Sequence, residues 1–219
     1  MSSQSFADLG VSRPVSQALA DREIITPFAV QRLVLPDALA GHDVLAKSPT
    51  GSGKTLAFAI PIAEQIEATD QRPAALVLAP TRELALQIVD DMHDIAHSRA
   101  LSVAAVYGGA GIDKQSKLAR RAHVLVATPG RLEDLLERGT FSLKNVRILV
   151  LDEADRMLDM GFRPAVDRIV RQVPRDRQTM FFSATLDGEV RRVADAYTTN
   201  ARTHEHRFAP ERTADIDHR

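Results

Sequence analysis

The chain has 219 residues, of which 44% are hydrophobic and 26% charged, so it is long enough for one well-buried domain of ordinary soluble composition. It contains no cysteine, which excludes disulfides and thiolate metal sites and fits a cytoplasmic protein; we find no apolar run of membrane-spanning length and no signal peptide, so we expect no membrane association. The formal net charge of −1 gives no global indication of a polyanionic partner.

Short apolar runs alternate with longer amphipathic stretches along the chain. Two short helices are predicted first, over 14–21 and 28–39, and helical spacing recurs at Leu84, Ile88, Met92 and Ile95. The apolar runs are too short for buried helices and several are rich in Val, Ile or Phe, which predicts strands at 44–46, 74–79, 102–106, 123–127, 147–151 and 179–182. Such alternation is typical of an α/β fold with a doubly wound, mainly parallel sheet flanked by helices, in which ligands bind at the carboxyl ends of the strands.

Segment 48–55, between a predicted strand and a predicted helix, has the composition of a phosphate-binding loop. Glycines let backbone N–H groups turn toward phosphate oxygens, a lysine reaches the β and γ phosphates, and the adjacent hydroxyl coordinates Mg²⁺. A helix beginning near Lys54 adds its positive dipole end. We therefore predict nucleotide binding by Ser48, Thr50, Gly51, Ser52, Gly53, Lys54 and Thr55, with Thr55 also a metal ligand. Ser48 stands where the usual pattern has glycine or alanine, and the alternative is a Gly/Ser-rich turn with an exposed lysine.

An acidic motif, Asp152-Glu153-Ala154-Asp155, directly follows the predicted strand 147–151. Carboxylates that leave a buried strand are costly unless a cation or hydrogen bonds await them. Beside a phosphate loop, Asp152 is a candidate Mg²⁺ ligand, and Glu153 is a candidate to position or deprotonate the attacking water. The alternative is an acid-rich helix N-terminus.

Further motifs follow in a fixed order, and together they indicate a family. They are Thr26-Pro27-Phe28-Ala29-Val30-Gln31, the phosphate loop, Pro80-Thr81-Arg82-Glu83-Leu84-Ala85, Gly108-Gly109, Thr128-Pro129-Gly130-Arg131, the acidic motif and Ser183-Ala184-Thr185. This series resembles the first RecA-like domain of the DEAD-box RNA helicases, from about Phe6 to Tyr197.

The resemblance implies a domain organisation and a function. Residues 1–200 would form a RecA-like, ATP-binding domain with an upstream glutamine-motif region at about 4–32, and 201–219 would begin an interdomain linker. The second RecA-like domain, absent from this chain, would be its partner, together with RNA, and we expect a monomer. The chain would bind ATP, Mg²⁺ and the RNA backbone to remodel duplexes when joined to that domain, and alone we expect it to be nearly inactive.

The resemblance also assigns residues to the base. The glutamine that matches Gln31 reads the adenine edge, for which an amide offers both a donor and an acceptor. Thr26 belongs to the same motif, whereas Ile24 stands where the family often has an aromatic ring that stacks on adenine. A surface glutamine on a helix is the alternative for Gln31.

Other motifs are assigned to RNA and to catalysis. The positions that grip the sugar–phosphate backbone with little sequence preference are matched by Pro80, Thr81, Arg82, Gly108, Gly109, Thr128, Pro129, Gly130 and Arg131. The catalytic set is Lys54, Asp152, Glu153, Ser183 and Thr185, of which Ser183 and Thr185 link the acidic site to RNA. Alternatives stay open: a surface salt bridge for Arg131, capping of a helix near Asp187 for the two hydroxyls, and core packing for Phe6.

Charge is unevenly distributed along the chain. Residues 1–98 carry 7 basic and 12 acidic side chains, and residues 99–192 carry 17 and 12. The basic excess could build a phosphate-binding face or a solvated arginine-rich surface. Two other functions remain open: a stand-alone domain that holds nucleotide or RNA without turnover, and a DNA helicase of the wider superfamily.

Overall fold

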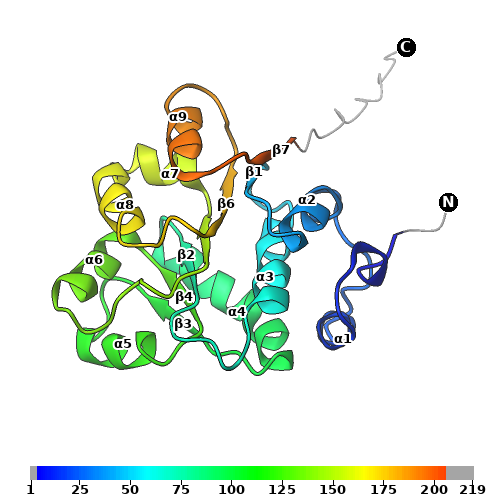
Figure 1. Ribbon diagram of the computed structural model, residues 1–219, viewed down its shortest axis with the longest axis horizontal. Helices are drawn as coiled ribbons and strands as arrows, with labels where there is room; N and C mark the ends of the chain where they lie inside the picture. Colours follow the sequence, from blue (N-terminus) through cyan, green and yellow to red (C-terminus); the bar gives the residue numbers. More distant parts are fainter. Residues whose placement is uncertain (1–3, 206–219) are drawn as a thin grey trace, which may run out of the picture.

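In the computed structural model, which describes residues 4–205, seven strands form one parallel sheet in the order β3-β4-β2-β5-β6-β1-β7 (Figure 1). The strands are β1 (Val44–Lys47), β2 (Ala75–Leu78), β3 (Val103–Val106), β4 (Val124–Ala127), β5 (Ile148–Leu151), β6 (Gln178–Ser183) and β7 (Arg202–Glu205). The first six confirm the strands predicted from the apolar runs, and the parallel pairing confirms the fold class.

Strand β7 lies where the interdomain linker is predicted to begin, and it is a strand that the apolar runs do not predict. Residues 202–205 pair in parallel with β1, and the backbone N–H of Arg202 donates to the Asp43 carbonyl at 2.8 Å. This edge strand is polar and largely exposed, so it lacks the apolar run by which the other strands are recognised. The remainder of the predicted linker, 206–219, lies outside the described residues.

Helices cover both faces of the sheet. One face carries α1 (Arg13–Ala20), α2 (Ala29–Leu39), α3 (Lys54–Gln65) and α4 (Arg82–Ser98); the 3₁₀ turn η1 (Ala7–Leu9) lies beside α2. The other carries α5 (Ile112–Ala119), α6 (Pro129–Glu137), α7 (Ala154–Asp159), α8 (Arg163–Val170) and α9 (Gly188–Tyr197). The predicted helices at 14–21 and 28–39 are thus confirmed to within one residue at each end. Among the described residues, no helix combines the length and apolarity that crossing a bilayer requires.

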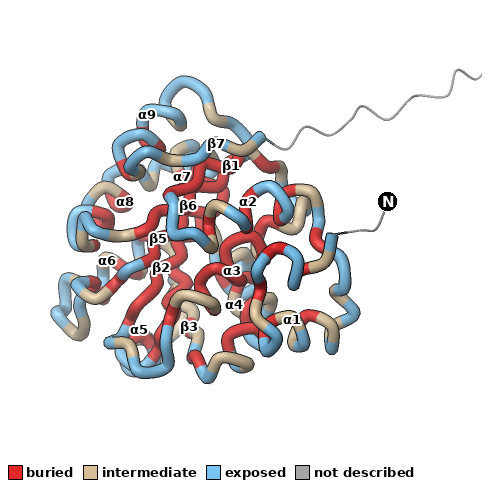
Figure 2. Tube along the Cα trace, turned by 45° about the vertical axis from the view of Figure 1, so that its right-hand side comes forward, coloured by how far each residue is buried: buried red, intermediate tan, exposed pale blue. Residues whose placement is uncertain are grey.

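Successive residues of the central strands enter opposite cores, which is why these strands are apolar throughout. In β6, Met180 and Phe182 pack under α2 and α3, where Phe182 meets the Phe58 ring edge-on at 5.4 Å between centroids. Phe181 packs under α7 and α9 on the other face. Figure 2 shows the resulting buried interior along the strands. Phe6 is buried in the first core, so it has a packing role.

Candidate functional site

The motifs that follow predicted strands converge on one edge of the sheet, at the carboxyl ends of β1 to β6. The phosphate loop connects β1 to α3, and the acidic motif follows the end of β5. The backbone N–H of Ser48 donates to the Ser183 carbonyl at 2.8 Å, which ties the loop to the end of β6. Topology, rather than nearness in sequence, brings these residues together.

The phosphate loop has the backbone that its glycines allow. Gly51 and Gly53 adopt φ values of +81° and +82°, a left-handed conformation that disfavours other residues. Gly53 is the N-cap of α3, so the positive end of this 12-residue helix faces the loop. Ser48 is fully buried with its Oγ against that of Ser52, so serine fits where glycine or alanine is usual.

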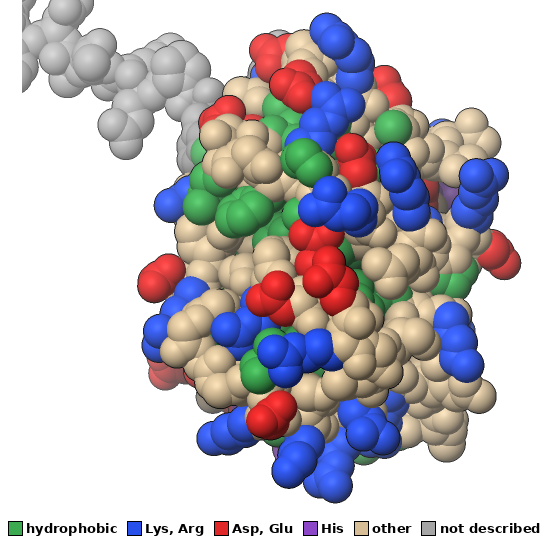
Figure 3. Space-filling view, turned by 90° about the vertical axis from the view of Figure 1, so that its left-hand side faces the viewer, with side chains coloured by type: hydrophobic (Ala, Val, Ile, Leu, Met, Phe, Trp, Pro, Cys, Tyr) green, Lys and Arg blue, Asp and Glu red, His purple; other side chains and the backbone are tan. Residues whose placement is uncertain are grey.

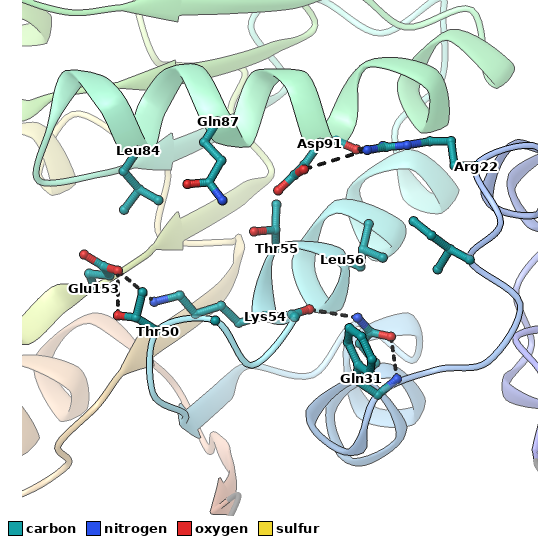
Figure 4. A pocket seen from close by; sticks show the side chains of 14 residues that line it. Arg22, Gln31, Thr50, Lys54, Thr55, Leu56, Leu84, Gln87, Asp91 and Glu153 are labelled. Atoms are coloured by element: carbon teal, nitrogen blue, oxygen red, sulfur yellow. Dashed lines mark hydrogen bonds and ion pairs between the residues drawn. The ribbon is translucent and has the colours of Figure 1, made fainter.

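Lys54 lies in a buried cluster with the two acids of the second motif. Its Nζ is 3.0 Å from Asp152 Oδ1 and 3.4 Å from Glu153 Oε1 (Figure 4 shows the Glu153 contact). All three side chains are at most 8% exposed. The alternative of a turn with an exposed lysine is therefore wrong, and the lysine and the acids balance one another's charge.

Asp152 has an acceptor that the protein does not use. Its Oδ1 accepts from the Glu153 backbone N–H at 2.9 Å and pairs with Lys54, whereas Oδ2 is buried without a hydrogen-bond partner among the described residues. Burial raises the pKa of Asp152, and the Lys54 ammonium opposes this rise. An unpaired buried carboxylate oxygen beside a phosphate loop is a suitable ligand for Mg²⁺, a hard cation that takes oxygen donors.

Glu153 is held in an uncommon conformation. It is the N-cap of α7 with φ +50°. A left-handed non-glycine residue costs about 1–3 kcal/mol, persists only where its surroundings hold it, and is found preferentially at functional sites. Thr50 Oγ1 donates to Oε1 at 3.0 Å, and Arg156 Nη1 donates to Oε2 at 3.2 Å. Burial alone would raise the pKa of Glu153, but Lys54 and these hydrogen bonds outweigh it and lower the pKa. The carboxylate is therefore kept ionised and oriented.

A cavity of about 280 Å³ extends from this cluster to the glutamine motif (Figure 4). Gln31 lines it and is 1% exposed, so the alternative of a surface glutamine is wrong. Its Oε1 accepts from the Phe28 backbone N–H at 2.8 Å, and its Nε2 donates to the Gly53 carbonyl at 2.9 Å. The amide thus joins the motif to the phosphate loop and keeps one donor and one acceptor capacity. Ile24 and Thr55 also line the cavity, whereas Thr26 is exposed and is not among the described residues that line it.

The same cavity contains residues that the sequence motifs do not single out. Arg22 Nη1 donates to the Asp91 carbonyl at 2.8 Å, and its guanidinium lies 3.8 Å from the Asp91 carboxylate. Burial raises the pKa of Asp91, partly offset by Arg22 and by a hydrogen bond with Thr55. Leu56 and Gln87 also belong to this set. Arg22 and Asp91 are 69 residues apart, and the sequence contains no local signal that pairs them.

The residues assigned to RNA form a second group, at the ends of β2, β3 and β4. Arg82 lies over the Tyr107 ring, 5.0 Å from its centroid, and within 3.8 Å of the Cβ position of Gly109, which has φ +85°. Arg131 Nη1 donates to the Ala110 carbonyl at 2.8 Å. Three of the motifs are therefore adjacent in space. The remaining assigned residues range from buried Pro80 and Pro129 through half-buried Thr81 and Thr128 to exposed Gly108 and Gly130.

Two of the open alternatives for this region can be answered. Arg131 Nε is 3.6 Å from Asp134, so the predicted salt bridge exists, but the side chain is only 14% exposed. Thr81 caps α4 by accepting from the Leu84 N–H at 3.2 Å.

By contrast, α9 begins after Asp187 with no side-chain cap bond in the described structure, so the capping role of Ser183 and Thr185 is wrong. Instead, Ser183 Oγ accepts from the Thr185 N–H, and Asp155 Oδ2 accepts from the Ala184 N–H at 3.2 Å, which joins this motif to the acidic one.

Part of the basic excess of residues 99–192 is neutralised at the surface. Figure 3 shows basic and acidic side chains interspersed on the face that carries α6 and α8. The pairs include Arg168–Glu133, Arg163–Glu189 and Arg191–Asp195. Exposed pairs of this kind contribute little to stability. On this face, the interpretation of a solvated arginine-rich surface holds.

Comparison with known proteins relates the site to a family. The chain matches the DEAD/DEAH box helicase family over residues 28–193. It is 39% identical over 214 residues to the ATP-dependent RNA helicase DbpA of Bacillus subtilis, covering 97% of this chain and 45% of that protein. It is 45% identical over 191 residues to the ATP-dependent RNA helicase DeaD of Escherichia coli, covering 86% and 30%.

Solved structures agree with this match. A DEAD box protein from the hyperthermophile Methanococcus jannaschii has a TM-score of 0.88 at 36% identity, covering 92% of this chain and 55% of that one. A hypothetical ATP-dependent RNA helicase from Sulfolobus tokodaii has a TM-score of 0.83 at 37% identity, covering 89% and 57%. The chain spans less than half the length of the two curated relatives. The family match covers most of the chain and the fold agrees, so the chain belongs to the DEAD/DEAH box helicase family.

Proposed function

We propose that this chain is the ATP-binding domain of an RNA helicase, which binds ATP with Mg²⁺ and the RNA backbone and drives duplex remodelling together with a second RecA-like domain. The observation that carries the proposal is the buried cluster of Lys54, Asp152 and Glu153 at the phosphate loop. A merely structural ion pair would have its oxygens satisfied, whereas Asp152 Oδ2 has no hydrogen-bond partner within residues 4–205.

The phosphate end of the cavity is formed by the loop. Lys54, now held by two carboxylates, would turn its Nζ toward the β and γ phosphates, and the N–H groups at the start of α3 would receive their oxygens. Thr55 and Asp152 would hold the metal ion. When bound, Mg²⁺ supplies positive charge that stabilises the phosphoryl oxygens as the bond to the leaving group breaks.

Glu153 is the proposed base. Its lowered pKa keeps it ionised at neutral pH, and Thr50 and Arg156 orient the two carboxylate oxygens. When Lys54 moves to phosphate, Oε1 keeps the Thr50 hydrogen bond but loses the ammonium, so it gains room to align the attacking water or to accept its proton. Asp155 accepts a hydrogen bond from the Ala184 N–H, next to Ser183, so a shift of the acidic motif would also displace the end of β6.

RNA would bind by its backbone. Arg82 and Arg131 lie next to the Gly108–Ala110 turn, so that guanidinium groups and backbone N–H groups are available together. Such donors contact phosphates and carry no sequence information. The curated relatives are named RNA helicases, which favours RNA over DNA as the substrate, and we propose a cytoplasmic monomer.

Calorimetric titration tests the nucleotide part of this proposal. We expect ADP and ATP to bind only with Mg²⁺ and GTP to bind much more weakly, because the free donor and acceptor of Gln31 do not match guanine. Equal binding of GTP and ATP would refute the adenine assignment. Competition between RNA and DNA strands of one sequence tests the other part, and preference for DNA would refute it.

A further inference from the structure

Phe28 is an exposed aromatic residue in a place where exposure needs an explanation. Its side chain is among the large apolar groups on the surface, at 60% exposed, and yet it lines the nucleotide cavity. Ile25, three residues earlier, is similarly exposed at 63%, but it is not one of the described residues that line the cavity. Exposure in this loop is therefore not enough to place a side chain at the site.

The ring is seated on the phosphate loop. A Cβ atom at Gly53 would lie 2.3 Å from Phe28 Cδ2 and 3.1 Å from Cε2, so the ring occupies the space that any other residue at 53 would need. The Phe28 N–H donates to Gln31, and Gln31 donates to the Gly53 carbonyl. Ring, amide and loop are therefore held as one unit, and the ring lies beside the amide proposed to read the base.

The other candidate for stacking is poor. Ile24 lines the same cavity, but an aliphatic side chain has no π face and gains only apolar contact from a base. An aromatic ring stacks on any base, and covering its exposed face removes apolar surface from water. Of the described residues that line the cavity, Phe28 is the aromatic one.

We infer that Phe28 supplies the stacking surface for the adenine ring, in the role that Ile24 cannot fill. The inference rests on the proposed function and names the residue that determines how firmly the base is held. The phosphates would bind to the loop and to Lys54 without contact with this ring. Loss of the ring should therefore weaken the binding of nucleotides and leave the binding of a ligand without a base unchanged.

The test uses the absence of tryptophan from the chain. Phe28→Trp introduces a single indole, and we expect Mg²⁺–ADP to quench its emission while Mg²⁺–tripolyphosphate does not. Ile25→Trp is the matched control, and its emission should not change with either ligand. By titration calorimetry, Phe28→Ala and Phe28→Leu should bind ADP about 5- to 150-fold more weakly than the unaltered chain, the range that base–aromatic stacking gives. All variants should bind tripolyphosphate equally well, and circular dichroism checks that each is folded.

The outcomes are distinct. Unchanged ADP affinity of Phe28→Leu would overturn the inference, since apolar contact alone would then suffice. Equal losses of ADP and tripolyphosphate in Phe28→Ala would also overturn it, because the ring would then only support the loop. If the unaltered chain bound tripolyphosphate but no ADP, the proposed function itself would fail.

Discussion

Lys54 Nζ lies 3.0 Å from Asp152 Oδ1, and the two side chains are 7% and 0% exposed. Buried ion pairs gain little net stability, yet removal of one partner leaves an uncompensated charge in the interior. The pair therefore couples the ligand site to the stability of the fold, and the two effects can be separated by mutation.

Lys54→Met should abolish most Mg²⁺–ADP binding and lower the free energy of unfolding by about 3–5 kcal/mol, because Asp152 then stays buried without its partner. Adding Asp152→Asn should recover much of the stability and none of the binding. Urea unfolding and calorimetry measure the two quantities, and Lys47→Met, at the end of β1, is the control. Equal stability of Lys54→Met and the unaltered chain would show that the pair is not coupled to folding.

Glu153→Gln should retain ATP binding while hydrolysis falls by about 10²–10⁴, the usual loss when a general base or water-positioning group is removed. The measurement is RNA-stimulated turnover in a chain extended by the proposed second RecA-like domain. Glu189→Gln, an exposed carboxylate at the start of α9, is the matched control. Turnover of Glu153→Gln at the unaltered rate would mean that another group handles the water.

The 219-residue chain alone should hydrolyse ATP barely above background and should not unwind RNA. Among the described residues, the basic side chains that line the cavity are Lys54 and Arg22, and Arg22 is held by Asp91. An arginine that neutralises transition-state charge is worth about 10³–10⁵ in rate, and we expect the proposed second domain to supply it. Steady-state assays with saturating RNA, on this chain and on the extended one, compare the two directly. Robust stimulated turnover by the short chain would contradict this.

Asp91→Asn should stabilise the protein at neutral pH. Burial raises the folded-state pKa of Asp91, so the ionised carboxylate is disfavoured in the fold, and the unaltered protein loses stability as pH rises from the ordinary Asp pKa to the raised one. The variant lacks that loss, and its advantage should vanish below about pH 4, where the carboxyl is protonated in both states. Chemical unfolding across this pH range measures the difference. An advantage for the unaltered protein at neutral pH would show that the Arg22 contact outweighs burial.

Arg82→Ala should weaken RNA binding equally for different sequences and reduce the slope of log affinity against log salt by about one, as expected for one lost phosphate contact. Arg138→Ala, at the carboxyl end of α6, is the control: it removes an arginine that lies outside the motifs and should leave the slope unchanged. Fluorescence anisotropy over a salt series gives both slopes. A sequence-dependent loss in Arg82→Ala would indicate base contact instead.

The sequence by itself determined the fold class, six of the seven strands and the residues of the phosphate loop and the acidic motif. Local chemistry is enough for these: apolar runs must be buried, and a loop that surrounds phosphate requires glycines, a lysine and a hydroxyl residue in fixed order. Only the tertiary structure decided the rest. The pairing of Arg22 with Asp91, the lack of a protein partner for Asp152 Oδ2 and the position of the Phe28 ring over Gly53 depend on contacts between distant segments. Strand β7 is recognisable only from its neighbour β1, because an exposed polar edge strand is stabilised by backbone pairing, which leaves no pattern in the side chains.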